Sequence, residues 1–122
     1  MGNSQQSVST DSASTESSCA EIIQHGPYQF SIKGTVDFAT VPGLLKQAQN
    51  YLKVSAAEKT KQLVFDLSQI KTCNSAALAL ILEMIKLGKQ VRLSMQFENM
   101  PDSLLRIAKA YGIETEIRDF LK

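Results

Sequence analysis

Histidine is almost absent from this 122-residue sequence, in which His25 is the only one. It lies in the segment His25-Gly26-Pro27, whose composition is typical of a turn. A Ser-His-Asp or Cys-His arrangement needs a histidine beside its nucleophile, and no second imidazole is present to complete a histidine-based metal site. We therefore expect no catalytic centre of these kinds, no metal and no cofactor.

Clustered glycines and paired carboxylates are also missing. The glycines at positions 26, 34, 43, 88 and 112 are isolated, so neither a phosphate-binding loop nor a dinucleotide-binding fingerprint can be assembled from them. Carboxylates such as Asp37, Glu83 and Asp102 show no pairing that indicates acid/base catalysis. Asp66, at the end of an apolar segment, is best interpreted as a turn-forming residue. The sequence thus predicts that the protein is not an enzyme.

The net charge is close to zero, at +1, and the basic residues are scattered one at a time. No basic cluster interleaved with aromatic residues indicates nucleic-acid binding. No apolar run reaches the roughly 18 to 20 residues that cross a bilayer, so we expect a cytoplasmic protein without direct membrane insertion. The two cysteines, Cys19 and Cys73, lie in such different contexts that a structural disulfide between them is not expected.

The chain divides into a tail and one domain. Residues 1–18 are rich in Ser, Thr and Gln and have very few apolar residues, which predicts a disordered segment. The domain is expected to cover residues 19–122. Within it, residues 21–24 and 28–33 have the pattern of a strand hairpin, and residues 62–67 form an apolar strand of the kind covered on both faces.

Helical periodicity predicts three helices. Apolar residues recur at helical spacing from Val41 to Leu52, with Thr40 as the expected N-cap. A second helix is expected over residues 75–90 and a third over residues 101–111, where Gly112 ends it. Residues 91–97 alternate as in a strand. The strand at 62–67, the helix at 75–90 and the strand at 91–97 make a βαβ unit, so the fold class is α/β.

The helix expected at 75–90 is apolar around most of its circumference, over roughly 240° of arc. Ala77, Ile81 and Met84 should face the sheet, while Ser75, Ala79, Glu83, Lys86 and Gln90 form a polar stripe. The two flanks carry Leu78, Leu80, Leu82 and Leu87. Neighbouring helices could cover both flanks. Alternatively, part of this surface stays exposed and binds a partner, because a contiguous exposed apolar patch on a small domain usually marks an interaction site.

This helix begins at Asn74 and Ser75, which also allow two interpretations. Asn is among the best N-cap residues, because its side-chain oxygen accepts a hydrogen bond from a first-turn amide. A hydroxyl at the same place could instead carry a phosphate, whose charge the helix N-terminus would stabilise. From the residues alone both roles remain open for this pair.

The run VFDLSQIKTCNSAALALILEMIK resembles the signature of the STAS domain family, in which a strand ending in an Asp-Leu-Ser turn leads to an Asp-Ser-Ser-Gly-Leu helix start. The likeness extends over residues 20–121. Gly34-Thr-Val-Asp37 is similar to the family's Gly-Glu-Leu-Asp turn, and FENMPDSLLRIAKAYGIETEI is similar to the C-terminal part of the MlaB branch. The resemblance implies a mixed sheet of four to five strands with about three to four helices packed mainly on one face.

The resemblance to MlaB implies a non-catalytic subunit of an ABC system that moves phospholipids and maintains outer-membrane lipid asymmetry. Such a subunit binds the ATPase, MlaF, and through it meets the permease, MlaE. It therefore lies peripheral to the inner membrane. The partner-binding residues implied here are Asn74, Ser75, Ala76, Leu78, Ala79 and Leu82.

A second role is known among proteins that share the signature. Anti-sigma factor antagonists bind an anti-sigma kinase and are released by phosphorylation of a hydroxyl that falls on Ser75. In this sequence Asn74 replaces the acid that precedes that hydroxyl, and Ala76-Ala77 replace the residues that follow it. An Asn can still cap the helix, but the missing carboxylate weakens the expectation of phosphate regulation.

Overall fold

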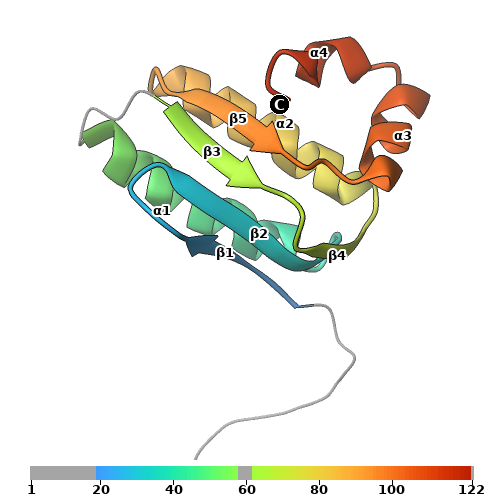
Figure 1. Cartoon of the computed structure of the whole chain (residues 1–122), viewed down its shortest axis with the longest axis horizontal. Helices are drawn as coiled ribbons and strands as arrows, with labels where there is room; N and C mark the ends of the chain where they lie inside the picture. The colour runs from blue at the N-terminus through green and yellow to red at the C-terminus, as the bar shows by residue number, and fades with distance from the viewer. Residues whose placement is uncertain (1–18, 58–61, 122) are drawn as a thin grey trace, which may run out of the picture.

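A computed structural model describes residues 19–57 and 62–121 of the chain, and the disorder expected for residues 1–18 lies outside them. Strands and helices are interspersed along the chain, in places with two of one kind in succession (Figure 1). The strands are β1 (Ala20–Gln24), β2 (Gln29–Val36), β3 (Gln62–Asp66), β4 (Ile70–Cys73) and β5 (Ser94–Glu98). The helices are α1 (Val41–Ala57), α2 (Ser75–Gln90), α3 (Asp102–Ala110) and α4 (Glu114–Arg118).

The five strands form one mixed sheet. β1 and β2 are antiparallel and make the expected hairpin, with Ile22 opposite Ile32. β2 pairs in parallel with both β3 and β4, and β3 pairs in parallel with β5. The parallel β3–β5 pair joined through α2 confirms the βαβ unit. Because β2, β3, β4 and β5 all run the same way, their carboxyl ends lie at the same edge of the sheet.

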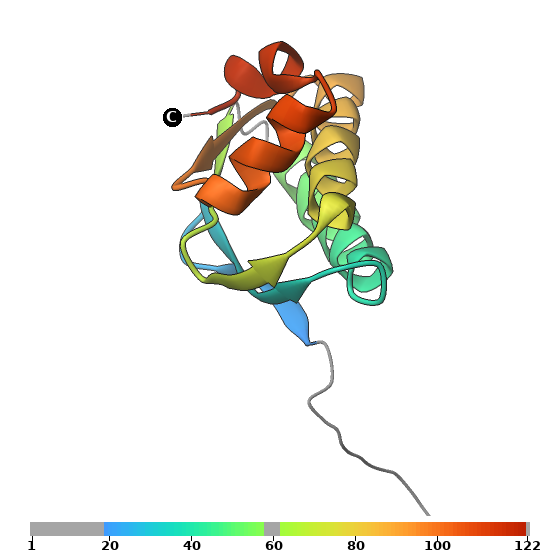
Figure 2. The same cartoon turned by 90° about the vertical axis from the view of Figure 1, so that its right-hand side faces the viewer.

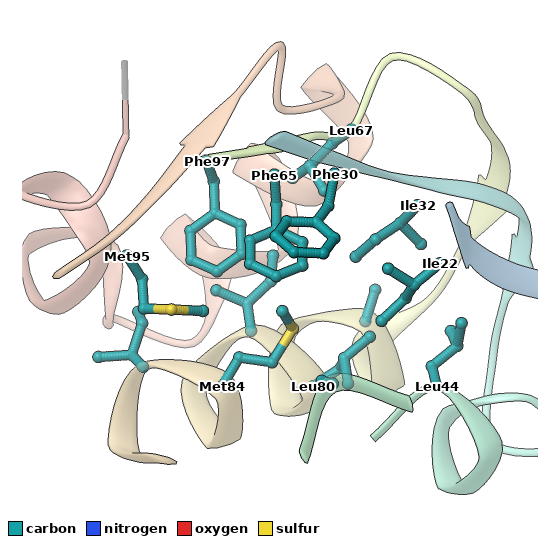
Figure 3. Close-up of a cluster of buried hydrophobic side chains, with 14 of the residues drawn as sticks. Ile22, Phe30, Ile32, Leu44, Phe65, Leu67, Leu80, Met84, Met95 and Phe97 are labelled. Carbon is teal, nitrogen blue, oxygen red and sulfur yellow. The ribbon is translucent and has the colours of Figure 1, made fainter. Parts of the chain in front are cut away.

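The helices cover one face of the sheet, as expected. Viewed along the sheet, α1 and α2 lie side by side against it, and α3 and α4 lie beside α2 at the β5 side (Figure 2). Phe30, Phe65 and Phe97 come from three neighbouring strands and stack toward Met84 of α2 (Figure 3). All three rings are no more than 1% exposed. This row of aromatic rings is the centre of the core.

β3 differs from its expectation. Its burial alternates, with Leu63 and Phe65 buried and Val64 and Asp66 only half-buried. The expected two-sided covering is therefore wrong, because none of the helices in residues 19–57 and 62–121 lies on the second face of the sheet (Figure 2). That face is largely polar, since Gln29, Val64 and Gln96 are neighbours on it in the register of the three strands.

Several boundaries also shift. The strand expected at 91–97 begins only at Ser94, because Val91 caps α2 and Arg92 turns with a positive φ of 61°. β4 and α4 are two elements that the residue patterns did not indicate. β4 has four residues that pair with β2 far away in sequence, and α4 has five residues anchored by the buried Ile117.

Gly34 is the residue of β2 that pairs both with Ala20 of β1 and with Ile70 at the start of β4. Its φ is +108°, in the region that favours glycine, and a Cβ there would fall on the Cys19 carbonyl oxygen and lie 2.9 Å from Ala20 Cα. The sheet register also shifts between Gly34 and Thr35, as in a β-bulge. Gly34 therefore allows β1 and β4 to approach β2 from opposite sides.

We expect Gly34→Ala to lower the free energy of unfolding by at least about 2 kcal/mol, because the methyl group adds backbone strain to a clash with main-chain atoms. Urea unfolding followed by circular dichroism measures the change. Gly43→Ala is the matched control, since a Cβ at Gly43 meets nothing within 4 Å inside α1. Alanine there should leave stability unchanged or raise it. Equal effects of the two substitutions would contradict the close approach at Gly34.

Candidate partner-binding site

The site lies where β2 and β4 end side by side. Val36 and Cys73 are partners in the last rung of this parallel pair, and the Asn74 amide donates to the Val36 carbonyl at 3.3 Å. Beyond Val36 the chain enters the β2–α1 loop, and beyond Cys73 it passes through Asn74 into α2. The parallel pairing therefore brings the loop at residues 37–40 next to the start of α2 (Figure 2).

Asn74 caps α2. Its backbone is extended, with φ −131° and ψ −164°, and its side-chain Oδ1 accepts a hydrogen bond from the Ala76 amide at 2.8 Å. This geometry confirms the N-cap interpretation of Asn74. The side chain is exposed, so a partner could reach it without disturbing the core.

Ser75 is the first residue of α2 and is half-buried. Within the part of the chain that the structure describes, its hydroxyl makes no side-chain hydrogen bond. It lies at the positive end of the α2 dipole. The position is thus chemically suited either to a hydrogen bond with a partner or to a phosphate.

The β2–α1 loop borders the start of α2. Hydrogen bonds from its own side chains hold its shape. Asp37 Oδ1 accepts hydrogen bonds from the amides of Ala39, at 2.9 Å, and Thr40, at 3.0 Å. The Thr40 hydroxyl donates to the Thr35 carbonyl at 2.8 Å. Thr40 does precede α1, as expected of the N-cap, but its hydroxyl fixes the loop instead of binding a first-turn amide of the helix.

This loop presents Phe38 to solvent. Its side chain is 71% exposed, the largest value among the large apolar residues that are described. The hydrogen bonds of Asp37 and Thr40 hold the backbone on either side of it. Nothing in the residue pattern around Phe38 distinguished it from a core aromatic, and only the folded loop shows it on the surface.

The start of α3 also borders the site. Cys73 Sγ and Ser103 Oγ are 3.5 Å apart, which ties the residue before the α2 cap to the first turn of α3. Both cysteines of the chain are free thiols. Three segments distant in sequence thus meet at this edge of the sheet.

The exposure of α2 differs from the interface expectation. Leu78 is 2% and Leu80 is 1% exposed, and Ala76 is also buried, so these residues offer no open apolar surface. Leu82 and Leu87 are half-buried. Little of this apolar surface is exposed because other segments of the chain pack against both flanks of α2. Leu82 lines a groove with Phe120, after α4, and Leu87 lines a hollow with residues of α1.

The residues expected to bind a partner therefore separate into two groups. Asn74, Ser75, Ala79 and Leu82 reach the surface along one stripe of α2, while Ala76 and Leu78 lie within the core side of the helix. The stripe continues into Glu83 and Lys86, as the helical phase predicts. Together with Phe38, we call Asn74, Ser75, Ala79 and Leu82 the α2 site.

Asp66 and His25 have structural roles at a distance from the α2 site. Asp66 Oδ1 accepts from Asn99 Nδ2 and from the Ser68 amide, each at 2.9 Å, which confirms its turn-forming role. The Asn99 hydrogen bond is the main reason that the pKa of Asp66 is lowered from 3.8. His25 Nε2 lies 2.8 Å from the hydroxyl of the buried Ser31.

The described residues offer neither a metal site nor a membrane-spanning helix. Residues 19–57 and 62–121 contain no group of three or more His, Cys, Asp and Glu side chains placed to hold a metal ion. In the same part of the chain, no helix has both the length and the apolar character needed to cross a membrane.

The fold and the start of α2 define a STAS domain. The profile of the family described as "Mlab, STAS domain" matches residues 22–121. The match covers almost all of the described chain. The chain therefore belongs to the STAS domain family, in its MlaB-like group.

Solved structures agree with this fold. SpoIIAA, an anti-sigma factor antagonist, in its unphosphorylated form has a TM-score of 0.63 at 10% identity, over 85% of this chain and 86% of that one. An anti-sigma factor antagonist from Mycobacterium paratuberculosis has a TM-score of 0.57 at 20% identity, over 82% of each chain. Identities this low show the fold alone. No curated protein matches the chain.

We expect Asn74→Ala to lower the free energy of unfolding by about 1 kcal/mol, because the Ala76 amide loses the side-chain oxygen that caps it. Chemical denaturation of the purified protein measures the difference. Asn74→Asp is the matched control. It keeps an oxygen in the same place and adds a charge that the helix N-terminus favours, so it should retain the stability of the cap. An Asn74→Ala variant as stable as the wild type would contradict the capping role.

Proposed function

We propose that this protein is a non-catalytic interaction subunit of an ABC phospholipid transport system, and that it binds the ATPase subunit through the α2 site. The match to the MlaB-like family over residues 22–121 carries this proposal. The partner is an MlaF-like ATPase, which connects the subunit indirectly to an MlaE-like permease. Binding to this complex would hold the protein at the inner membrane and support transport that maintains outer-membrane lipid asymmetry.

The composition of the α2 site supports a protein partner. Phe38 supplies an exposed aromatic ring of the kind that often anchors an interface. Ala79 is small and exposed, so another backbone could approach α2 closely there. None of the five residues of the site is charged. A surface of this kind favours complementarity with another protein over recognition of an ionic ligand.

The polar groups around the site support the same interpretation. The side chains of Asn74, Asp37 and Thr40 bind the backbone of their own turns. Their contacts fix the shape of the loop that carries Phe38 and of the start of α2. A rigid, preformed surface loses little conformational entropy on binding, which favours docking as a unit.

Ala79→Arg is expected to weaken binding to the purified ATPase subunit at least about tenfold, because a long charged side chain would separate the two surfaces at the centre of the site. Ala79 is exposed on a helix and Arg is a good helix former, so the fold should be retained. Isothermal titration calorimetry with the ATPase subunit measures the affinity, and the melting temperature checks folding. This position is a cleaner probe than Leu82, whose side chain is half-buried.

Ala110→Arg is the matched control, since Ala110 is an exposed alanine at the last residue of α3. It should bind the ATPase subunit like the wild type. An Ala79→Arg variant that folds and binds with unchanged affinity would overturn the placement of the interface on the α2 site. Failure of the wild-type chain to bind the ATPase subunit at all would overturn the proposed function.

A second candidate function is that of an anti-sigma factor antagonist regulated by phosphorylation of Ser75. The observation that favours it is the Ser75 hydroxyl, which has no hydrogen bond in the described structure and lies at the N-terminus of α2. The two candidate functions differ in whether Ser75 is phosphorylated. Intact mass after incubation with an anti-sigma kinase and ATP would show one added phosphate, absent in Ser75→Ala, only if the second is correct.

A further inference from the structure

A groove lies between the C-terminal half of α2 and the segment that contains α4; both elements are labelled in Figure 1. Its volume is about 520 Å³, and its apolar lining comes from Leu82, Ile85 and Phe120. Lys86, Lys89 and Glu116 stand among the other lining residues. The groove is open to solvent.

The charges along the groove are unbalanced. Two ammonium groups, of Lys86 and Lys89, face one carboxylate, of Glu116, and that carboxylate already accepts a hydrogen bond from the Thr115 hydroxyl at 2.9 Å. Neither lysine forms an ion pair among the described residues. Lys89 Nζ instead lies 5.6 Å from the centre of the Phe120 ring, so its charge stays at the groove wall. The wall therefore has positive charge available to a ligand.

The groove is continuous with the α2 site. Leu82 belongs to both, because it lies on the exposed stripe of α2 and also lines the groove. Lys86 follows Leu82 by one helical turn, so one ligand running along α2 from Ser75 would pass Leu82 and then meet the lysines. The two surfaces thus form a single path on one side of the helix.

We propose that this groove binds a segment of the ATPase subunit in which apolar side chains accompany at least one Asp or Glu. This inference rests on the proposed function, because it assigns a second contact to the same partner. The apolar side chains would cover Leu82, Ile85 and Phe120, and the carboxylate would pair with Lys86 or Lys89. Such a pair at the rim of an interface contributes mainly through the association rate and its dependence on salt.

The double variant Lys86→Glu/Lys89→Glu of the full chain tests the proposal. We expect its affinity for the purified ATPase subunit to fall about tenfold at low ionic strength, through slower association, and the deficit to shrink in high salt. Biolayer interferometry at two salt concentrations measures both rates. Both lysines are exposed, so the fold should persist. The single variant Lys86→Glu spares the Lys89–Phe120 contact and should show a smaller loss in the same direction.

Lys46→Glu/Lys53→Glu is the matched control, because it makes the same change in net charge at two exposed positions of α1. Its affinity should stay within about twofold of the wild type, since long-range charge effects are screened. Equal losses in both double variants, or no loss in either while Ala79→Arg still weakens binding, would overturn the groove contact alone. If the wild-type chain did not bind the ATPase subunit at all, the proposed function itself would be wrong.

A second copy of this chain is the other occupant that the test can detect. Light scattering during size-exclusion chromatography should show one molecular mass for the wild type and the Lys86→Glu/Lys89→Glu variant. A wild-type dimer that becomes a monomer in this variant would overturn the proposal in favour of self-association through the groove.

Discussion

The parallel pairing of β2 with β4 is the constraint on which the site depends. It places Val36 beside Cys73 and is extended by the hydrogen bond from the Asn74 amide to the Val36 carbonyl. Because both strands end at the same edge, the loop that carries Phe38 and the N-terminus of α2 leave the sheet together. Without this short strand, the signature turn would not be fixed relative to the β2–α1 loop.

The surroundings of α2 explain how a helix that is apolar around most of its circumference remains in a small domain. The sheet covers one side, α1 covers one flank, and α3 with the C-terminal segment covers the other (Figure 2). This leaves a narrow surface stripe that includes Ser75, Ala79 and the edge of Leu82. The interface proposed for this domain therefore consists of a few exposed residues and not of a broad apolar patch.

Strong periodicity made much of the fold predictable from the sequence. The apolar run of β3, the helix at α2 and the hairpin of β1 and β2 are all present, and Asn74 caps its helix as its chemistry indicates. β4 was not predictable in the same way, because its four residues gain their structure from pairing with β2 in a distant part of the chain. The five residues of α4 are too few for a periodic signal, and tertiary packing of Ile117 holds them.

The candidate site was only partly predictable for a related reason. A helical wheel places Leu78 and Leu82 on the same flank, but it contains no information on how closely a neighbouring helix approaches each of them. Leu78 is enclosed and Leu82 reaches the surface. Phe38 was missed because its exposure follows from the loop that Asp37 and Thr40 build, whereas Phe is among the residue types most often buried.

Hydroxyl-radical footprinting with and without the ATPase subunit tests the central claim most directly, since it reports the solvent access of individual side chains. Phe38, Tyr28 and Tyr111 are all highly exposed, at 71%, 54% and 62%, so each serves as a probe in the same molecule. We expect the partner to reduce the oxidation of Phe38 strongly and to leave Tyr28, in the turn before β2, unchanged. Protection of Tyr28 with Phe38 still fully oxidised would place the partner elsewhere and contradict docking at the α2 site.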